Sequence, residues 1–275
     1  MRKRTKTITL VAVLISSSLL MYLAVGASSQ YGHGRRNDFL KVVWFETGLL
    51  HSYSVQSYLS VITQFNFNAV GVEPFPITPE SLAFCDVISA YASSNGLTKF
   101  LIVGTSLGVD WDLVAKYKNT DYIMSIDDSG VASTANLEKL KALGCQTMLV
   151  CWYDEALRPM FARGLVNYAC FCYYPYYPSR TDTEQFDNMV RLGKLCIETN
   201  VNYLPAIQCF GMAGQTWRFP TPGEIGVLCE NSSIYGHATG LIYFTPFTGQ
   251  STRGEYFEGW MDHYDVWNGI KYGVW

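Results

Sequence analysis

Short runs of apolar residues recur along most of the chain. Each run ends in polar, glycine or proline residues, and an amphipathic stretch follows it. There are eight such runs, at residues 41–45, 69–72, 99–103, 122–126, 147–152, 166–172, 203–209 and 240–244. Near-continuous hydrophobicity, in place of strict alternation, is typical of strands that are covered on both faces. The pattern therefore predicts eight parallel strands with helices packed outside them.

The segments between the runs carry helix signals. Thr78-Pro79-Glu80 supplies an N-cap and a proline at the first helical position, and Asn95-Gly96 is a typical helix end. Thr221-Pro222-Gly223-Glu224 has the spacing of a capping box. Apolar residues at helical spacing predict further helices over residues 133–143, 182–199 and 256–270.

Eight β/α units in about 235 residues predict a single (β/α)8 TIM barrel, an α/β fold for which roughly 250 residues are typical. The main alternative is a doubly wound open sheet. That alternative is disfavoured because it would place a glycine-rich phosphate loop after the first strand, whereas this chain has Glu46-Thr47-Gly48 there. We assign the barrel domain to residues 39–275.

The N-terminus has the pattern of an export signal. Basic residues occur among the first six positions, and residues 8–25 are apolar and uncharged. The apolar run is close to the shortest length that spans a membrane, and Val25 and Ala27 are suitable for signal cleavage. Residues 1–27 are therefore either a cleaved signal peptide or a retained signal anchor, and residues 28–38 form a polar tether. Both alternatives place the barrel outside the cytoplasm, secreted or anchored to the membrane by one N-terminal helix.

Composition narrows the possible partners. Hydrophobic residues make up 49% of the chain and charged residues 16%, which allows a large core. A net charge of −3 provides no basic field for nucleic acid. Aromatic residues at 15% indicate either a bulky core or stacking platforms for sugars. The eight cysteines contain no CxxC pair of the kind that binds zinc, and the histidines are scattered, so we expect no metal and no cofactor. The cysteines of an exported protein could form disulfides, but four of these lie inside apolar runs, which favours buried free thiols.

Active sites of such barrels lie at the carboxyl ends of the strands. Two carboxyl groups that flank the scissile bond are the requirement of glycoside hydrolysis. The candidate catalytic acids at these ends are Glu46, Glu73, Asp127, Asp128 and Asp154. We favour Asp127 or Asp128 paired with Asp154, from neighbouring strands, with Glu46 or Glu73 as substitutes. The candidate substrate-binding residues are Trp44, Trp152, Tyr174, Gln208, Trp217 and Tyr243.

Each acid also has a structural interpretation. Asp154 is suited to cap a helix, where an acid complements the helix dipole. Asp127 and Asp128 precede Ser129-Gly130 and could form an ordinary turn. Glu46 could pair with an arginine at the barrel mouth, and Glu73, which precedes Pro74, could accept hydrogen bonds from loop amides. If capping and pairing account for all of these acids, a binding protein is favoured over an enzyme.

Three stretches resemble the last two β/α units of the glycoside-hydrolase-like barrel superfamily. They are residues 205–208 (PAIQ), 217–225 (WRFPTPGEI) and 235–244 (YGHATGLIYF). Ser125-Ile126-Asp127-Asp128 is similar to the acidic turn after strand 4 of that superfamily, and the Tyr-Pro loop at 173–178 resembles theirs. The resemblance covers roughly residues 40 to 270. It implies a barrel with a catalytic or sugar-binding acid at Asp127 or Asp128.

The chain also departs from that superfamily. Its large retaining clan has Asn-Glu after strand 4 and a glutamate nucleophile at strand 7, whereas this chain has Asp127-Asp128 and Gln208. The mechanism of that clan therefore does not carry over. The first hypothesis is an exported glycoside hydrolase that acts on a polysaccharide or glycoconjugate by carboxylate acid/base catalysis. The alternative is a non-catalytic cell-surface barrel that binds glycan or protein. The membrane is a partner only if the N-terminal segment is uncleaved.

Overall fold

The computed structural model describes residues 39–49, 53–105, 107–127, 130–176, 182–213, 218–250 and 256–272. The proposed signal or anchor and the tether, residues 1–38, lie outside this part, so both assignments stay predictions. Among the described residues, no helix combines the length and the apolar character that crossing a membrane requires.

Every predicted apolar run contains a strand of one parallel sheet. The sixth and seventh runs each contain two short strands, separated by Phe171 and by residues 204–205 respectively. The strands are β1 (Leu40–Glu46), β2 (Ala69–Glu73), β3 (Thr98–Thr105), β5 (Tyr122–Asp127), β6 (Thr147–Val150), β7 (Tyr168–Cys170), β8 (Cys172–Tyr173), β9 (Asn202–Tyr203), β10 (Ala206–Gln208) and β12 (Gly240–Phe244). All eight predicted runs thus form strands, but the described sheet has ten parallel strands in place of the predicted eight, because two of the runs are each divided into two strands.

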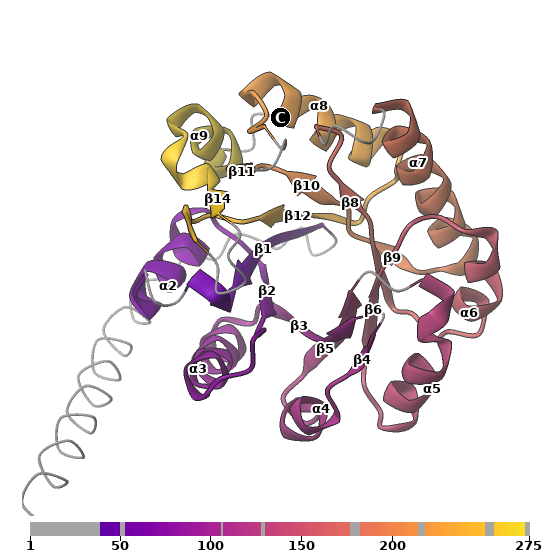
Figure 1. Ribbon diagram of the computed structural model, residues 1–275. Coiled ribbons are helices and arrows are strands. Elements are labelled where there is room, and N and C mark those ends of the chain that lie inside the picture. Colours follow the sequence, from indigo (N-terminus) through magenta and orange to yellow (C-terminus); the bar gives the residue numbers. More distant parts are fainter. Residues whose placement is uncertain are drawn as a thin grey trace, which may run out of the picture. The chain divides into compact units, whose positions relative to one another are not determined.

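The strands pair in the order β8-β10-β12-β1-β2-β3-β5-β6-β7-β9. The two ends of this order are β8 and β9. Along the chain β8 directly follows β7, and β10 directly follows β9, so the two ends of the sheet are formed by the same two chain segments. Backbone hydrogen bonds continue across both breaks, from Leu204 N to Ala169 O and from Ala206 N to Phe171 O, each 2.8 Å long. Figure 1 shows the resulting sheet curled around an inner face with the helices outside it.

In the described part of the chain, one α-helix follows each of the eight runs. The helices are α2 (Val55–Gln64), α3 (Pro79–Asn95), α4 (Trp111–Tyr117), α5 (Thr134–Ala142), α6 (Arg158–Ala162), α7 (Asp182–Thr199), α8 (Pro222–Ile234) and α9 (Tyr264–Tyr272). Short 3-10 turns precede four of them, namely η1 (Thr47–Leu49), η2 (Gly130–Ser133), η3 (Glu155–Leu157) and η4 (Trp260–Asp262). This regular alternation makes the chain an α/β protein with a curled parallel sheet.

The capping signals fix the helix starts that the sequence predicted. The Thr78 hydroxyl accepts a hydrogen bond from the backbone of Ser81 at 3.1 Å, and α3 ends at Gly96, whose φ of 64° is left-handed. Thr221 and Glu224 form the predicted capping box at the start of α8. Both features satisfy backbone groups that helix ends leave unpaired.

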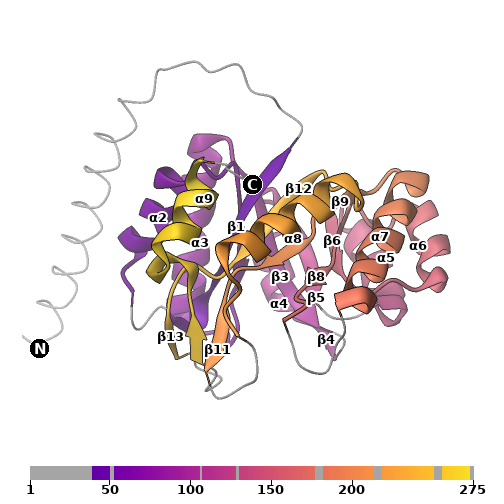
Figure 2. The same cartoon turned by 90° about the horizontal axis from the view of Figure 1, so that it is seen from above.

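The predicted helix over 256–270 is wrong in its first half. Tyr256–Glu258 is a strand, β14, which pairs antiparallel with β11 (Gly211–Ala213) and β13 (Gly249–Gln250). Pairing with β11, which is distant in sequence, and with the nearby β13 overrides the local apolar spacing. Figure 2 shows this small sheet at one end of the main sheet. The short strand β4 (Gly108–Val109), which pairs antiparallel with β3, projects from the same end.

The inner face of the curled sheet is filled by apolar side chains. They are Val42, Trp44, Ala69, Phe100, Ile102, Ile123, Met148, Val150, Cys170, Leu204, Ala206 and Ile242. Trp44 lies against Gly71, where a Cβ atom would come within 1.9 Å of the Trp44 Cε3 atom. The eight cysteines are free, and all except Cys172 are buried, as expected. In the described part of the chain the interior of the sheet is therefore a packed core, which directs the search for a site to the ends of the strands.

Candidate functional site

Three of the candidate acids belong to the inner face at the carboxyl ends of their strands. They are Glu46 on β1, Glu73 on β2 and Asp127 on β5. Alternate residues of a strand point to the same side. Each acid lies an even number of positions beyond a member of the inner cluster on its own strand, namely Trp44, Ala69 and Ile123. The alternation therefore directs all three carboxyl groups to the inner side of one edge of the sheet.

The strand register places Glu46 beside Glu73, whereas β3 separates Asp127 on β5 from both of them. Glu46 and Glu73 are paired positions of the β1–β2 ladder, and Asp127 pairs with Thr105 of β3, the strand next to β2. Neighbouring strands lie about 4.8 Å apart. Glu46 is only 3% exposed, whereas Glu73 and Asp127 are partly exposed. The structure thus assembles an acidic row from β1, β2 and β5.

Asp154 has a different role from these acids. It is exposed, and its side chain caps η3 by accepting a hydrogen bond from the Ala156 amide at 2.9 Å. Because β6 already ends at Val150, the alternation of the strand no longer directs Asp154 inward. Strand geometry therefore does not bring Asp154 to the acid of β5 with which the sequence analysis paired it. Asp128 and Trp217 lie outside the described residues.

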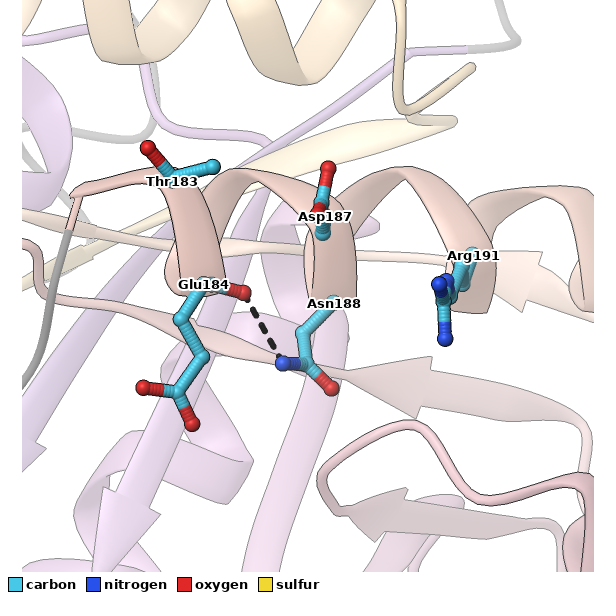
Figure 3. Close-up of a pocket in the computed structure, with 5 residues that line it drawn as sticks. All are labelled: Thr183, Glu184, Asp187, Asn188 and Arg191. Atoms are coloured by element: carbon cyan, nitrogen blue, oxygen red, sulfur yellow. Dashed lines mark hydrogen bonds between the residues drawn. The ribbon is translucent and has the colours of Figure 1, made fainter.

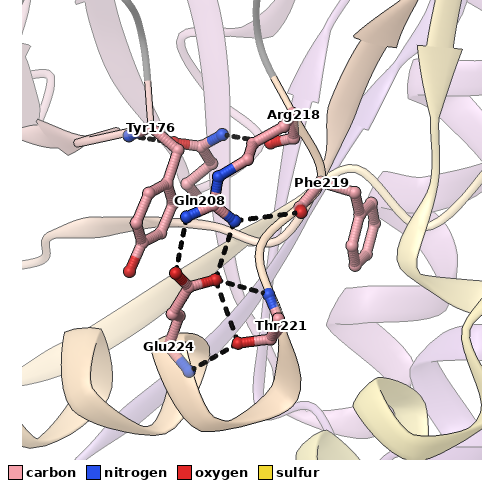
Figure 4. A network of polar contacts seen from close by, with 6 residues as sticks. All are labelled: Tyr176, Gln208, Arg218, Phe219, Thr221 and Glu224. Atoms are coloured by element: carbon pink, nitrogen blue, oxygen red, sulfur yellow. Dashed lines mark hydrogen bonds and ion pairs between the residues drawn. The ribbon is translucent and has the colours of Figure 1, made fainter.

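Gln208 is fully buried, and its side-chain amide holds two loops. Its Oε1 accepts from the Tyr176 amide at 3.1 Å. Its Nε2 donates to the carbonyl of Arg218 at 3.1 Å and to that of Phe210 at 3.4 Å. Figure 4 shows the side chain between the loop after β8 and the segment that enters α8. These bonds use the groups with which Gln208 was expected to bind substrate.

An ion pair lies beside Gln208 that the sequence analysis did not identify. The Arg218 guanidinium donates to both oxygens of Glu224, at 2.5 and 2.8 Å, and lies 4.2 Å from the centre of the Tyr176 ring. Arg218 lowers the pKa of Glu224 to about 2, with help from hydrogen bonds donated by Thr221. Figure 4 shows the carboxylate shared between Arg218 and the start of α8. The capping box was the only signal of this network in the sequence.

Aromatic side chains gather at the carboxyl ends of β8, β10 and β12. Ring centres are 5.1 Å apart for Tyr174 and Phe210, 5.3 Å for Phe210 and Phe244, and 5.6 Å for Phe244 and Phe257. Met212 completes this group, which joins the main sheet to the small sheet of β11, β13 and β14. The strand-end edge thus has an aromatic side and an acidic side. Sequence reasoning identified Tyr174 alone, since the other rings come together only through the small sheet.

Three further candidates pack within the protein. Trp44 is 5% exposed and belongs to the inner core. Tyr243 is 6% exposed and lies on the opposite face of β12, where its ring centre is 5.9 Å from that of Phe67. Trp152 is partly exposed, with its ring 5.1 Å from Phe171 in an edge-on contact. Trp44 and Tyr243 therefore do not join the acids at the strand ends.

The Cys170 thiol near this edge is held in its neutral form. A hydrogen bond with Cys172, together with burial, raises the pKa of Cys170 well above its ordinary value. Burial likewise raises the pKa of the nearby Tyr174 hydroxyl. A thiolate is the nucleophilic form of cysteine, so Cys170 is not prepared for nucleophilic attack. Among the described residues, no three or more His, Cys, Asp or Glu side chains are arranged to hold a metal ion.

Two surface hollows occur away from the acidic row. One, of about 350 Å³, lies over the outer face of α7 and is lined by Thr183, Glu184, Asp187, Asn188 and Arg191. Figure 3 shows these side chains along a single helix, where the Asn188 amide donates to the Glu184 carbonyl at 2.8 Å. The other lies at the amino ends of the strands. Since barrels place catalysis at the carboxyl ends, the acidic row remains the candidate site.

No family model matches the sequence, and no curated protein matches it. Solved structures match the fold. A GH99 endo-α-mannosidase from Bacteroides thetaiotaomicron superposes with a TM-score of 0.56 at 11% identity, covering 84% of this chain and 94% of its own. The fold of this chain is similar to the TIM-barrel-like fold of that enzyme.

Two other glycoside hydrolases share this barrel fold. An endo-β-1,4-mannanase from Thermotoga petrophila has a TM-score of 0.51 at 8% identity, with 88% of this chain and 78% of that chain covered. The β-glucuronidase of Ruminococcus gnavus has a TM-score of 0.51 at 12% identity and covers 82% of this chain and 46% of its own. At such identities the likeness concerns the fold, and the chemistry must be argued from this chain's own residues.

Proposed function

We propose that this protein is an exported glycoside hydrolase that acts on a polysaccharide or glycoconjugate through the acidic row. The observation that carries the proposal is the placement of Glu46, Glu73 and Asp127 on one inner edge, at the carboxyl ends of β1, β2 and β5, with β3 between β2 and β5. The likeness of the fold to glycan-hydrolysing barrels supports the same substrate class. In this proposal the eight β/α units close a complete (β/α)8 barrel.

The reaction needs a proton donor and an ionised carboxylate on either side of the glycosidic bond. Burial favours the neutral form of a carboxyl group. We therefore assign Glu46, the most buried of the three, as the donor of a proton to the leaving glycosidic oxygen. Glu73 or Asp127, both partly exposed, supplies the carboxylate. It either attacks the anomeric carbon or removes a proton from the attacking water, and the carboxyl separation with substrate bound decides which.

The aromatic side of the edge would bind the sugar rings. Tyr174 and Phe244 lie at the ends of β8 and β12, and β12 is the neighbour of β1, which carries Glu46. Aromatic rings offer apolar faces to the CH faces of sugars, while carboxylates accept hydrogen bonds from hydroxyl groups. A glycan lying across this edge would meet both kinds of group at once.

The test is hydrolysis of α-mannan, β-1,4-mannan and β-glucuronide oligosaccharides by the full chain, with products identified by mass. We expect Glu46→Gln, Glu73→Gln and Asp127→Asn each to lower kcat/KM by at least about 100-fold on the accepted substrate. Asp154→Asn is the matched control, since that acid caps η3 and should leave hydrolysis unchanged. Wild-type rates in all three variants of the acidic row would remove the assignment.

A non-catalytic glycan-binding barrel is the second candidate. The observation in its favour is that Gln208 and Asp154, both expected in the site, are used to hold loop backbone and cap η3. This candidate predicts retention of the full chain on one of the same glycans without release of any product. Product release by wild type that is lost in Glu46→Gln would decide for the enzyme.

A further inference from the structure

The second hollow, of about 380 Å³, lies at the amino ends of β3, β5, β6 and β7, the edge opposite to the acidic row. We call it the lower cavity. Its principal polar side chains come from Asp121, Gln146 and Tyr168, and Ile123 supplies an apolar wall. Asp121 and Gln146 immediately precede β5 and β6, and Tyr168 begins β7. Four consecutive strands of the sheet therefore build one cavity.

The polar groups of the lower cavity are available to a ligand. Within the described part of the chain, no hydrogen bond engages the side chains of Asp121, Gln146 or Tyr168. Asp121 and Gln146 are exposed, whereas Tyr168 is partly buried with its ring edge-on to Phe100 at 5.3 Å. Burial raises the pKa of Tyr168, so its hydroxyl keeps the proton that it can donate. The cavity thus offers a carboxylate, a carboxamide, a phenol and an aromatic ring.

The charge of the cavity excludes anions as its ligands. Its cation, Lys99, is 3% exposed and already donates to Ser89 at 3.3 Å, to Ser93 at 2.9 Å and to the carbonyl of Thr120. An ammonium group has three donors, and these three contacts occupy them. The exposed charge that remains is the Asp121 carboxylate. A neutral ligand rich in hydroxyl groups, with an apolar face for the Tyr168 ring, fits this set.

We propose that the lower cavity is a second glycan-binding site, which holds one sugar residue of a chain against Tyr168 through hydrogen bonds to Asp121 and Gln146. Its volume falls within the range of about 300–1,000 Å³ found for small-ligand sites. This second-site proposal rests on the proposed function only in its choice of a glycan as the ligand. A site at the far end of the barrel would keep the enzyme on a polymeric substrate while the acidic row cleaves another part of it.

The test measures binding of the full chain to α-mannan and to β-1,4-mannan by affinity electrophoresis, separately from hydrolysis. The Asp127→Asn background prevents cleavage during the measurement. On it, the added pair Asp121→Asn and Gln146→Ala should weaken retention by about tenfold, which is the loss of one or two hydrogen bonds. Asparagine tolerates the left-handed backbone of Asp121, whose φ is 59°. Tyr168→Phe preserves the packing against Phe100 and should weaken retention less.

A matched control is Asp112→Asn, which removes an exposed acid on α4 and should leave retention unchanged. Equal retention with and without the Asp121/Gln146 pair, or no retention of any form on either mannan, would overturn the second site. Neither result bears on the proposed function, which the hydrolysis assay decides. Retention that depends on the lower cavity, in a chain that hydrolyses nothing, would support the second site and reject the enzyme.

Discussion

Glu46 and Glu73 are partners in the parallel ladder of β1 and β2, and strand alternation assigns both residues to the inner face. Carboxylates that serve one reaction act as a unit, so their mutational losses do not add. We expect the double variant Glu46→Gln/Glu73→Gln to lose about as much kcat/KM as the more damaging single variant. Additive losses in free energy, measured on one substrate, would show that the two acids act independently.

Position 71 on β2 must be a glycine because the Trp44 ring of β1 packs directly against it. A Cβ atom there would lie 1.9 Å from the Trp44 ring, inside the packed core. Gly71→Ala should lower the free energy of unfolding by about 1–3 kcal/mol or more, because the ring has no space into which to move. Urea denaturation measures this loss, and Trp44→Leu in the same chain should recover part of it.

Gly223→Ala is the control for that substitution. No atom lies within 4 Å of the added Cβ, and the position is in the first turn of α8. Its stability should be unchanged or slightly raised, since alanine favours a helix over glycine. Equal losses at Gly71 and Gly223 would refute the steric account.

Gln208 should contribute to stability through the loops that it joins. Gln208→Leu removes the acceptor of the Tyr176 amide and the donor to the Arg218 carbonyl, both in a buried setting. Unpaired buried groups predict a loss of about 1–3 kcal/mol in the free energy of unfolding. Gln64→Leu, at an exposed position on α2, is the control and should change stability by less than about 0.5 kcal/mol. A loss no larger than that of the control would contradict the bridging role.

The ion pair of Glu224 and Arg218 should make stability depend on acid pH. The pKa of Glu224 is about 2 in the folded protein, below its ordinary value of 4.5, so the unfolded chain binds more protons between these values. The stabilisation is therefore complete above about pH 4.5 and is lost as the pH falls toward 2. The pair is partly exposed, which limits its contribution to about 1 kcal/mol.

Unfolding of wild type and Glu224→Gln, measured by urea between pH 2 and 7, tests this expectation. The difference between the two proteins should be largest near neutral pH and should shrink steadily below pH 4.5. A difference that stays constant over the whole range would show that Arg218 does not stabilise the charged form of Glu224.

The local pattern of apolar and polar residues was sufficient to predict where the strands and most of the helices lie. The eight apolar runs and the caps at Thr78 and Thr221 use information that lies within a few residues, which is why their positions could be predicted. The strand β14 could not be predicted, because its partner β11 is distant in the chain and the nearby β13 is a strand of only two residues. Its apolar spacing fits a helix equally well until those partners are present.

The sequence by itself determined which side chains stand at the strand ends, because chain order and apolar periodicity are local properties. Tertiary structure alone decided which of them meet. Register paired Glu46 with Glu73, whereas Asp154 caps a helix and Gln208 holds two loops. A side chain's partner depends on strand alternation and on backbone groups brought from other segments. Neither is defined until the sheet has curled and its loops have packed.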